Sequence, residues 1–337
     1  MLIARAPVRV SLFGGGTDLP AYYERFGGAV LSTAINKHFY VILSHAEGAV
    51  EVFSADYRTF FRHSELTPCE WDDDLRLPKA VLDRFHVYES LSIFLASEIP
   101  PGTGLGSSGA VCVALVKALA TSLGQPADAL SVAEVACEVE LDQLDEPGGK
   151  QDQYAAAFGG LNVIEFSAGS VQVKPIELPL PLLQGLERRV LLFFTGTARN
   201  SSSILSQERA QILGGDEETL QALHEIKEQV SQAQELLQAG KLDEFGCLLH
   251  QAWEAKKRAL QGATNPEIDR LYEIARSAGA LGGKIAGAGG GGFLMVFAGE
   301  GRQQEITSRL EGEGLFSMNF GFESRGATVL LNALATP

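Results

Sequence analysis

The sequence predicts a protein of mixed helices and strands arranged in two domains. Its 337 residues, 45% of them hydrophobic, can bury a sizeable core and exceed the length of a typical single domain. Strand-like and helix-like segments alternate through the first half, whereas a long stretch rich in Glu, Gln, Lys and Leu opens the second half. Glycine and proline gather near residues 167–181, so we expect the domains to span 1–175 and 176–337.

Apolar runs rich in β-branched and aromatic residues predict the strands of the first domain. These strands are residues 8–13, 29–35, 39–44, 50–53, 60–61, 91–96, 161–166 and 171–176. Apolar residues at helical spacing predict helices at 79–85, 109–123 and 131–144. The last of these opens with Ser-Val-Ala-Glu at residues 131–134, which is the pattern of a capping box.

The second domain begins with a predicted strand at residues 190–195 and continues into a helical region from about 203 to 257. Glycines at 214–215 and at 240 predict two breaks in this region. The same patterns predict further helices at 268–278 and 303–310, and strands at 293–298, 318–322 and 327–331.

Composition and charge exclude several classes of partner and site. A formal net charge of −15 argues against binding to nucleic acid or to an anionic membrane. The four cysteines form no C-x-x-C pair, and Cys112 and Cys137 fall in apolar helical patterns, so we expect free buried thiols. The histidines show no zinc-binding spacing. Since the N-terminus lacks a signal-peptide core and no apolar run approaches the ~18 residues of a membrane span, we expect a cytoplasmic protein.

The most informative stretch is residues 100–110, PPGTGLGSSGA. It lies between a predicted strand and a predicted helix, and its three alternating glycines let the backbone approach a ligand closely because they have no Cβ. Ser107 and Ser108 place hydroxyls and free amides at the positive end of the helix, which favours phosphate binding. The spacing matches neither a Walker A loop nor a Rossmann fingerprint. A purely structural glycine turn is the alternative.

Two carboxylates follow this loop. Glu140 falls on the apolar face of the helix predicted at 131–144, where a carboxylate has to be paired, bound to a metal or protonated. Asp152 follows a glycine break and opens a short apolar helix. Since one loop separates the two residues, both can reach one pocket. The structural alternatives are a salt bridge for Glu140 and an N-cap for Asp152.

Three segments resemble the motifs of the GHMP small-molecule kinases, a superfamily that includes galactokinase, homoserine kinase and mevalonate kinase. They are residues 6–18 (APVRVSLFGGGTD), 100–110 and 282–292 (GGKIAGAGGGG). The resemblance spans nearly the whole chain. It implies an α+β protein with the two-domain GHMP kinase fold, whose active site lies in the cleft between the N- and C-terminal domains. It also implies phosphoryl transfer from ATP, with Mg²⁺ as the cofactor.

The same resemblance implies roles for individual residues. Asp152 is the base or the orienting group for the attacking hydroxyl, and Arg9 lies beside it and stabilises charge on the transferred phosphoryl group. Glu140 and the hydroxyl of Ser108 hold Mg²⁺. The nucleotide phosphates bind along Pro101, Gly102, Gly104, Leu105, Gly106, Ser107 and Ser108. The acceptor lies against Gly15, Gly16, Thr17, Asp18, Gly287 and Gly289.

Structural alternatives stay open for these assignments too. Arg9 could form an ion pair on a strand surface, Asp18 could be a turn residue, and the segment at 282–292 could be a flexible linker.

Within the superfamily, the motifs look most like those of the D-glycero-D-manno-heptose 7-phosphate kinases. The similar stretches are residues 14–18, 151–160, 195–203, 252–257 and 284–292. Such enzymes phosphorylate the anomeric (C1) hydroxyl to give the 1,7-bisphosphate, on the route to nucleotide-activated heptose for lipopolysaccharide or S-layer glycans. Galactokinase differs in the first motif, where it has Glu-His in place of Gly15 and Gly16.

A sugar 7-phosphate requires an anion pocket, and we expect Arg199 and the hydroxyls of residues 201–203 to form it, because a basic residue beside a helix start suits phosphate. A plain helix cap is the alternative. The expected partners are a small sugar phosphate and ATP, with no nucleic acid and no membrane, for a monomer or homodimer.

Other functions stay open. The chain could be another anomeric sugar kinase, acting on fucose, a uronic acid or an unphosphorylated heptose. It could also be a decarboxylase of the same superfamily that acts on a phosphorylated isoprenoid precursor, or a sensor that keeps the fold without catalysis.

Overall fold

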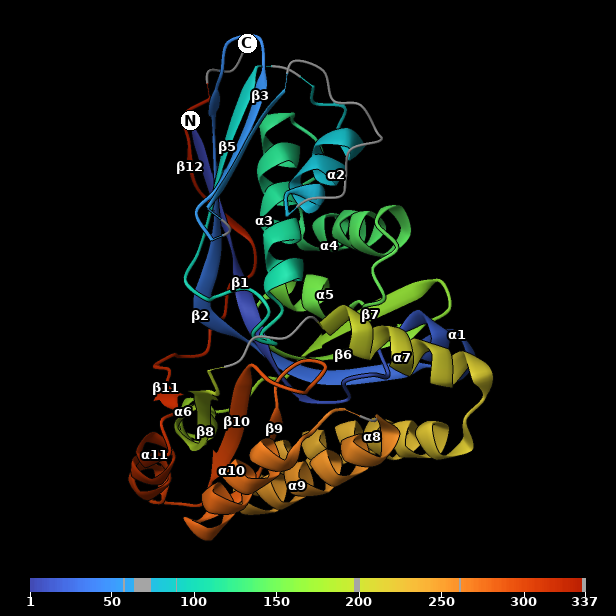
Figure 1. Cartoon of the computed structure of the whole chain (residues 1–337), viewed down its shortest axis with the longest axis vertical. Coiled ribbons are helices and arrows are strands. Elements are labelled where there is room, and N and C mark those ends of the chain that lie inside the picture. Colours follow the sequence, from blue (N-terminus) through green and yellow to red (C-terminus); the bar gives the residue numbers. More distant parts are fainter. Residues whose placement is uncertain (57, 64–73, 89, 197–200, 261, 335–337) are drawn as a thin grey trace.

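The computed structural model describes the chain except for residues 57, 64–73, 89, 197–200, 261 and 335–337. Within the described residues, two β-sheets lie one above the other along the long axis of the molecule (Figure 1). Helices cover one face of the upper sheet, and a second group of helices packs beneath the lower one. The confirmed fold class is therefore α+β.

The upper sheet is built around two long antiparallel strands, β1 (Leu2–Phe13) and β2 (Gly28–His45). β2 is long enough to pair with β6 (Leu161–Ser167) through its first part and with β5 (Leu91–Ser97) through its last part. The sheet continues through β3 (Val50–Ser54), β4 (Thr59–His63) and β7 (Ser170–Pro175). The strands predicted at 29–35 and 39–44 are thus one element.

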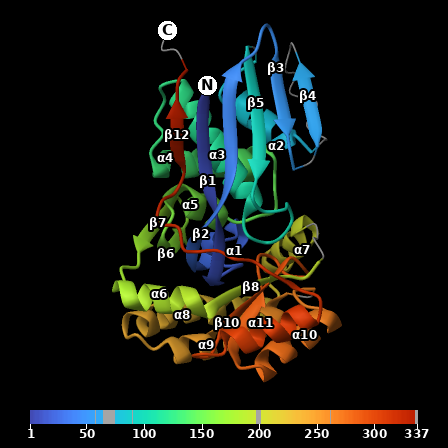
Figure 2. The same cartoon turned by 90° about the vertical axis from the view of Figure 1, so that its left-hand side faces the viewer.

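A late strand completes this sheet. β12 (Thr328–Asn332) pairs antiparallel with the outer edge of β1, with Leu2 opposite Asn332 (Figure 2). The chain therefore crosses between the two sheets twice. The division at residues 175 and 176 stays a prediction from sequence.

Helix α3 (Ser107–Ser122) is the central element of the helical layer. Its residues are apolar almost all round, which is typical of a helix buried on every side. Around it lie α1 (Pro20–Phe26), α2 (Arg76–Arg84), α4 (Ala129–Cys137) and α5 (Gln151–Phe158). Cys112 of α3 and Cys137 of α4 are buried free thiols, as the sequence predicted.

The helix predicted at 131–144 differs from the structure at both ends. α4 begins earlier because the Asp128 side chain caps it, accepting a 3.1 Å hydrogen bond from the amide of Ser131, so the predicted capping box is wrong. After Cys137 the backbone widens into a π-helical turn, η1 (Glu138–Gln143). Such turns are rare and often lie at functional sites. This one carries Glu140 into the interior.

The lower sheet has the order β11-β8-β10-β9, all antiparallel, formed by Phe316–Ser317, Val190–Phe194, Phe293–Ala298 and Ala280–Ile285. The helices of this half are α6 (Leu180–Arg189), α7 (Ser201–Gly214), α8 (Glu217–Gln238), α9 (Leu242–Ala259), α10 (Pro266–Ser277) and α11 (Gln303–Gly312). The predicted breaks are confirmed, since Gly215 and Gly240 both have positive φ, at 73° and 72°.

Three segments of this half depart from the sequence prediction. Residues 318–322, predicted as a strand, form only an isolated bridge between Phe322 and Ile35. β9 was hidden because its two glycines are typical of a loop. α6 was hidden by the prolines before it. Among the described residues, no helix has both the length and the apolar character needed to cross a bilayer.

Candidate active site

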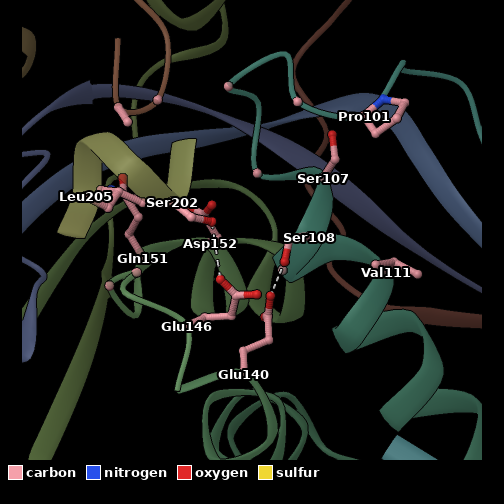
Figure 3. Close-up of a pocket in the computed structure, with 18 of the residues that line it drawn as sticks. Pro101, Ser107, Ser108, Val111, Glu140, Glu146, Gln151, Asp152, Ser202 and Leu205 are labelled. Atoms are coloured by element: carbon pink, nitrogen blue, oxygen red, sulfur yellow. Dashed lines mark hydrogen bonds between the residues drawn. The ribbon is translucent and has the colours of Figure 1, made fainter. Parts of the chain in front are cut away.

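A cavity of about 670 Å³ lies where the two sheets meet, and both halves of the chain line it. The upper half contributes β1, the loop after it, the loop before α3, η1 and the start of α5. The lower half contributes α7, α9, β9 and the loop after β9. Figure 3 shows this convergence: Ser202 of α7 lies beside Asp152 and donates a 3.4 Å hydrogen bond to Glu146.

The loop between β5 and α3 has the geometry of a phosphate site. Gly102, Gly104 and Gly106 all have positive φ, at 73°, 83° and 78°, so the loop adopts a backbone that other residues rarely allow. Ser107 and Ser108 are the first residues of α3. The hydroxyl of Ser107 is buried and has no hydrogen-bond partner among the described residues. An anion placed here would meet this hydroxyl and the positive end of α3.

Asp152, in the first turn of α5, lies against this loop. Arg9 of β1 holds its carboxylate in place. The guanidinium binds Asp152 Oδ1 through Nε at 2.8 Å and through Nη2 at 2.6 Å, and its Nη1 donates to the carbonyl of Gly104. A Cβ on Gly106 would lie 3.2 Å from the Asp152 carboxyl, and one on Gly109 would lie 2.7 Å from Asp152 Cβ. The glycines therefore allow the phosphate loop to touch the carboxylate directly.

Glu140 rises from η1 to the start of α3, where it contacts the hydroxyl of Ser108 (Figure 3). Gln153 Nε2 donates to its other carboxyl oxygen at 2.7 Å. Burial raises the pKa of Glu140 to about 7, although both hydrogen bonds act in the opposite direction. A carboxylate and a hydroxyl so placed fit the oxygen ligands that Mg²⁺ prefers. The described residues hold no cluster of three or more His, Cys, Asp or Glu side chains.

Asp18 also lines the cavity. It is buried and accepts hydrogen bonds from the amide of Gly16 at 3.1 Å, the amide of Gln151 at 3.3 Å and Gln151 Nε2 at 3.1 Å. Burial, followed by the charge of Asp152, raises the pKa of Asp18. Gln151, which binds Asp18, is adjacent to Asp152 in α5. This helix therefore links the residue predicted to bind the acceptor substrate to the predicted catalytic residue.

Most of the predicted site residues line this one cavity, but Thr17 and Leu105 do not. Thr17 is fully buried, and its hydroxyl binds the carbonyls of Gly14 and Ala29 at 2.8 Å, so it closes the turn instead of facing a ligand. Leu105 points into the core, and only its carbonyl contributes, by accepting from the Arg9 amide at 3.0 Å. Arg199 lies outside the described residues. The predicted residues that line the cavity are Arg9, Gly15, Gly16, Asp18, Pro101, Gly102, Gly104, Gly106, Ser107, Ser108, Glu140, Asp152, Gly287 and Gly289.

The glycine-rich segment after β9 packs directly on the phosphate loop and is not a linker. The carbonyl of Ala286 occupies the space that a Cβ on Gly104 would need, at 2.3 Å. Similarly, a Cβ on Gly292 would lie 2.4 Å from the Thr103 carbonyl, and the Phe293 amide donates to that carbonyl at 3.2 Å. The two halves of the chain therefore meet backbone to backbone at the cavity.

Sequence reasoning missed three buried charged residues in the cavity wall, namely Glu208 of α7, Lys256 of α9 and Lys284 of β9. Burial raises the pKa of Glu208 to about 7 and lowers that of Lys256. Lys256 falls in the apolar stripe of its helix, and Lys284 interrupts an apolar segment, so the sequence pattern could have marked both as buried charged residues. The apolar residues of α7 follow the helical period too weakly to show that Glu208 is buried.

The arrangement has defined chemical capabilities. The α3 N-terminus can bind a polyanion, and the Ser108 and Glu140 pair can hold a divalent cation beside it. The Asp152 carboxylate can accept a proton from a hydroxyl group bound between Asp18 and the phosphate loop. These are the parts that phosphoryl transfer to a hydroxyl requires.

Comparison with known proteins agrees with this chemistry. Residues 76–160 match the model of the N-terminal domain of GHMP kinases, and residues 233–314 match that of the C-terminal domain. The D-glycero-alpha-D-manno-heptose 7-phosphate kinase of Campylobacter jejuni is 31% identical over 330 residues, which cover 96% of each chain. The bifunctional fucokinase/GDP-fucose pyrophosphorylase of Arabidopsis thaliana is 27% identical over 93% of this chain and 31% of its own.

A solved structure extends the likeness to three dimensions. A D-glycero-D-manno-heptose 1-phosphate kinase from Bacteroides thetaiotaomicron superposes with a TM-score of 0.81 at 29% identity, over 99% of this chain and 100% of that one.

Proposed function

Because this chain belongs to the GHMP kinase family, we propose that it transfers the γ-phosphoryl group of ATP to the anomeric hydroxyl of D-glycero-D-manno-heptose 7-phosphate. The product is the 1,7-bisphosphate, a precursor of nucleotide-activated heptose for cell-surface glycans. The observation that carries the kinase chemistry is the Asp152 carboxylate, held by Arg9 at the end of the phosphate loop. The substrate is proposed from the likeness to heptose phosphate kinases.

Each group in the cavity has one task in this reaction. The phosphate loop and the α3 N-terminus bind the nucleotide phosphates, and Asp18 accepts hydrogen bonds from acceptor hydroxyls. Asp152 orients the attacking hydroxyl and takes its proton, while Arg9 keeps the carboxylate in place and offsets negative charge on the moving phosphoryl group. Most of the rate enhancement then comes from positioning and electrostatic stabilisation.

Ser108 and Glu140 are the residues that would hold Mg²⁺. When bound, the ion would neutralise part of the negative charge on the nucleotide phosphates. Glu140 is already held in place by Gln153, so its carboxylate needs little rearrangement to serve as a ligand.

Replacing Glu140 tests this assignment. We expect Glu140→Gln to raise the Mg²⁺ concentration for half-maximal activity by at least about tenfold, because one charged ligand is lost. The melting temperature should not fall, since the variant removes a buried, raised-pKa carboxyl and can keep the contacts of Ser108 and Gln153. Glu138→Gln is the matched control, because Glu138 lies on the exposed side of η1 and pairs with Arg84. Equal Mg²⁺ dependence in both variants would contradict the assignment.

Replacing Arg199 tests the proposed pocket for the 7-phosphate. We expect Arg199→Ala to raise KM for the phosphorylated sugar by about tenfold or more, with little change in KM for ATP, because a charge-assisted contact to one substrate is lost. Arg209→Ala is the control, since Arg209 is exposed and pairs with Asp145. Equal effects on both substrates, or none, would remove Arg199 from the pocket.

Release of ADP from ATP and Mg²⁺ tests the proposed function itself. The acceptors are D-glycero-D-manno-heptose 7-phosphate, the unphosphorylated heptose, fucose and galactose. Strong activity confined to the 7-phosphate supports the proposal. Activity on fucose alone favours the second candidate, a fucose kinase, which the Arabidopsis relative suggests. Silence with every acceptor would contradict both. A cytoplasmic location and a monomeric or homodimeric state remain predictions from the sequence.

A further inference from the structure

Lys284 occupies an unusual position in the cavity wall. It lies on β9, its residue is only 6% exposed, and it lines the cavity. Among the residues that the structure describes, its ammonium group has no hydrogen-bond acceptor and no ion-pair partner within contact. Lys256, the second lysine of this wall, differs because its ammonium donates to the carbonyl of Gly287.

The surroundings of Lys284 make its lack of a partner costly. Burial, then the charges of Lys256 and Arg9, lowers the pKa of Lys284 well below its usual range, and only the charge of Asp18 acts the other way. A buried ammonium that is repelled by the charges of two other cations needs a nearby anion to remain charged. The chain itself supplies no carboxylate in contact with it among the described residues.

The position of Lys284 suggests which anion would complete the site. Ala286, two residues further along, packs its carbonyl against Gly104 of the phosphate loop. The carbonyl of Gly104 binds Arg9, and Arg9 binds Asp152. Lys284 therefore enters the cavity from the lower half of the molecule, on the wall that meets the phosphate loop, while Arg9 enters from the upper half.

We propose that Lys284 binds a phosphate oxygen inside the cavity when the substrates are present. The oxygen belongs to the phosphoryl group in transfer or to the phosphate carried by the acceptor. The first source rests only on kinase activity, whereas the second also rests on the proposed sugar phosphate substrate. In either case Lys284 is a second cation for phosphate in the cavity, in addition to Arg9.

The test compares Lys284→Met, which removes the charge at similar length, with Lys284→Arg, which keeps it. Lys117→Met is the matched control, because Lys117 is a partly buried lysine whose pKa burial lowers, but it binds the Ala127 carbonyl away from the cavity. For each protein we would measure the binding of inorganic phosphate by calorimetry, the melting temperature, and kcat and KM with the heptose and its 7-phosphate.

We expect Lys284→Met to weaken phosphate binding by about tenfold or more, which is the effect of one lost charge-assisted hydrogen bond. Lys284→Arg should keep most of the affinity, and Lys117→Met should keep all of it. The melting temperature of Lys284→Met should be unchanged or higher, since a buried amino group without a partner among the described residues is replaced by an apolar side chain. A purely structural lysine would instead give a lower melting temperature and normal phosphate binding.

The kinetic measurements identify which phosphate group supplies the oxygen that Lys284 binds. With the 7-phosphate as acceptor, a fall in kcat with little change in KM identifies the phosphoryl group in transfer, whereas a rise in KM with little change in kcat identifies the acceptor phosphate. Unchanged phosphate binding together with unchanged kinetics would overturn the proposal. If the wild-type protein phosphorylates neither sugar, the proposed substrate fails, and the calorimetry still decides whether Lys284 binds phosphate.

Discussion

Replacing Asp152 with asparagine is expected to lower kcat by about 10²- to 10⁴-fold, the usual contribution of a positioned general base. Asparagine fills the same space against Gly106 and Gly109, so the phosphate loop should keep its shape. It carries no negative charge to accept a proton or to pair with Arg9. Nucleotide affinity should change little, because the loop and the α3 N-terminus are untouched.

Single-turnover kinetics and a nucleotide titration of the same preparation check this expectation. Asp142→Asn is a suitable control, since it removes an exposed carboxylate from the neighbouring η1 turn. A variant at position 152 that keeps most of its kcat would refute the catalytic role. A parallel loss of nucleotide binding would indicate that Asp152 supports the loop instead.

Replacing Gly104 with alanine is expected to damage both stability and nucleotide binding. Its φ of 83° disfavours any side chain, and the new Cβ would lie 2.3 Å from the backbone carbonyl of Ala286, which has no freedom to rotate away. Strain and collision together should cost about 2–5 kcal/mol of unfolding free energy. Because the collision moves the loop, nucleotide affinity or kcat should fall by about 10²-fold.

Gly124→Ala separates the cost of backbone strain from the cost of the collision with Ala286. Gly124 has a φ of 65°, but a Cβ there would meet nothing within 4 Å. It should therefore lose only about 1–2 kcal/mol to backbone strain and leave nucleotide affinity unchanged. Chemical denaturation and a nucleotide titration measure both effects. Equal losses in the two variants would show that the contact between Gly104 and Ala286 is unimportant.

The sequence predicted the parts of this protein whose signals are local. Strand and helix periodicity located most elements, and the breaks at Gly215 and Gly240 followed from glycine alone. The convergence of Glu140 and Asp152 on the phosphate loop also followed, because a carboxylate on an apolar helix face has few stable environments.

The remaining features depend on contacts between distant parts of the chain. The π-helical turn η1 (Glu138–Gln143) was not predicted, because no residue within it indicates the change from α-helical to π-helical geometry. Glu208 reaches the cavity only because α7 lies across it, close enough that a Cβ on Gly16 would lie 2.5 Å from its carboxyl oxygen. Thr17 was predicted to contact the acceptor substrate because it belongs to the first motif. Its hydroxyl instead binds the carbonyls of Gly14 and Ala29 within the turn.

The pairing of β12 with β1 also affects how the protein is made. During synthesis, β1 leaves the ribosome long before β12, the strand that covers its outer edge. Until then β1 presents unpaired amides and carbonyls, which is a template for association with other chains. The native sheet closes only through a contact between segments very distant in sequence, and such contacts form slowly. A nascent or C-terminally shortened chain therefore exposes this edge of β1 to association with other chains.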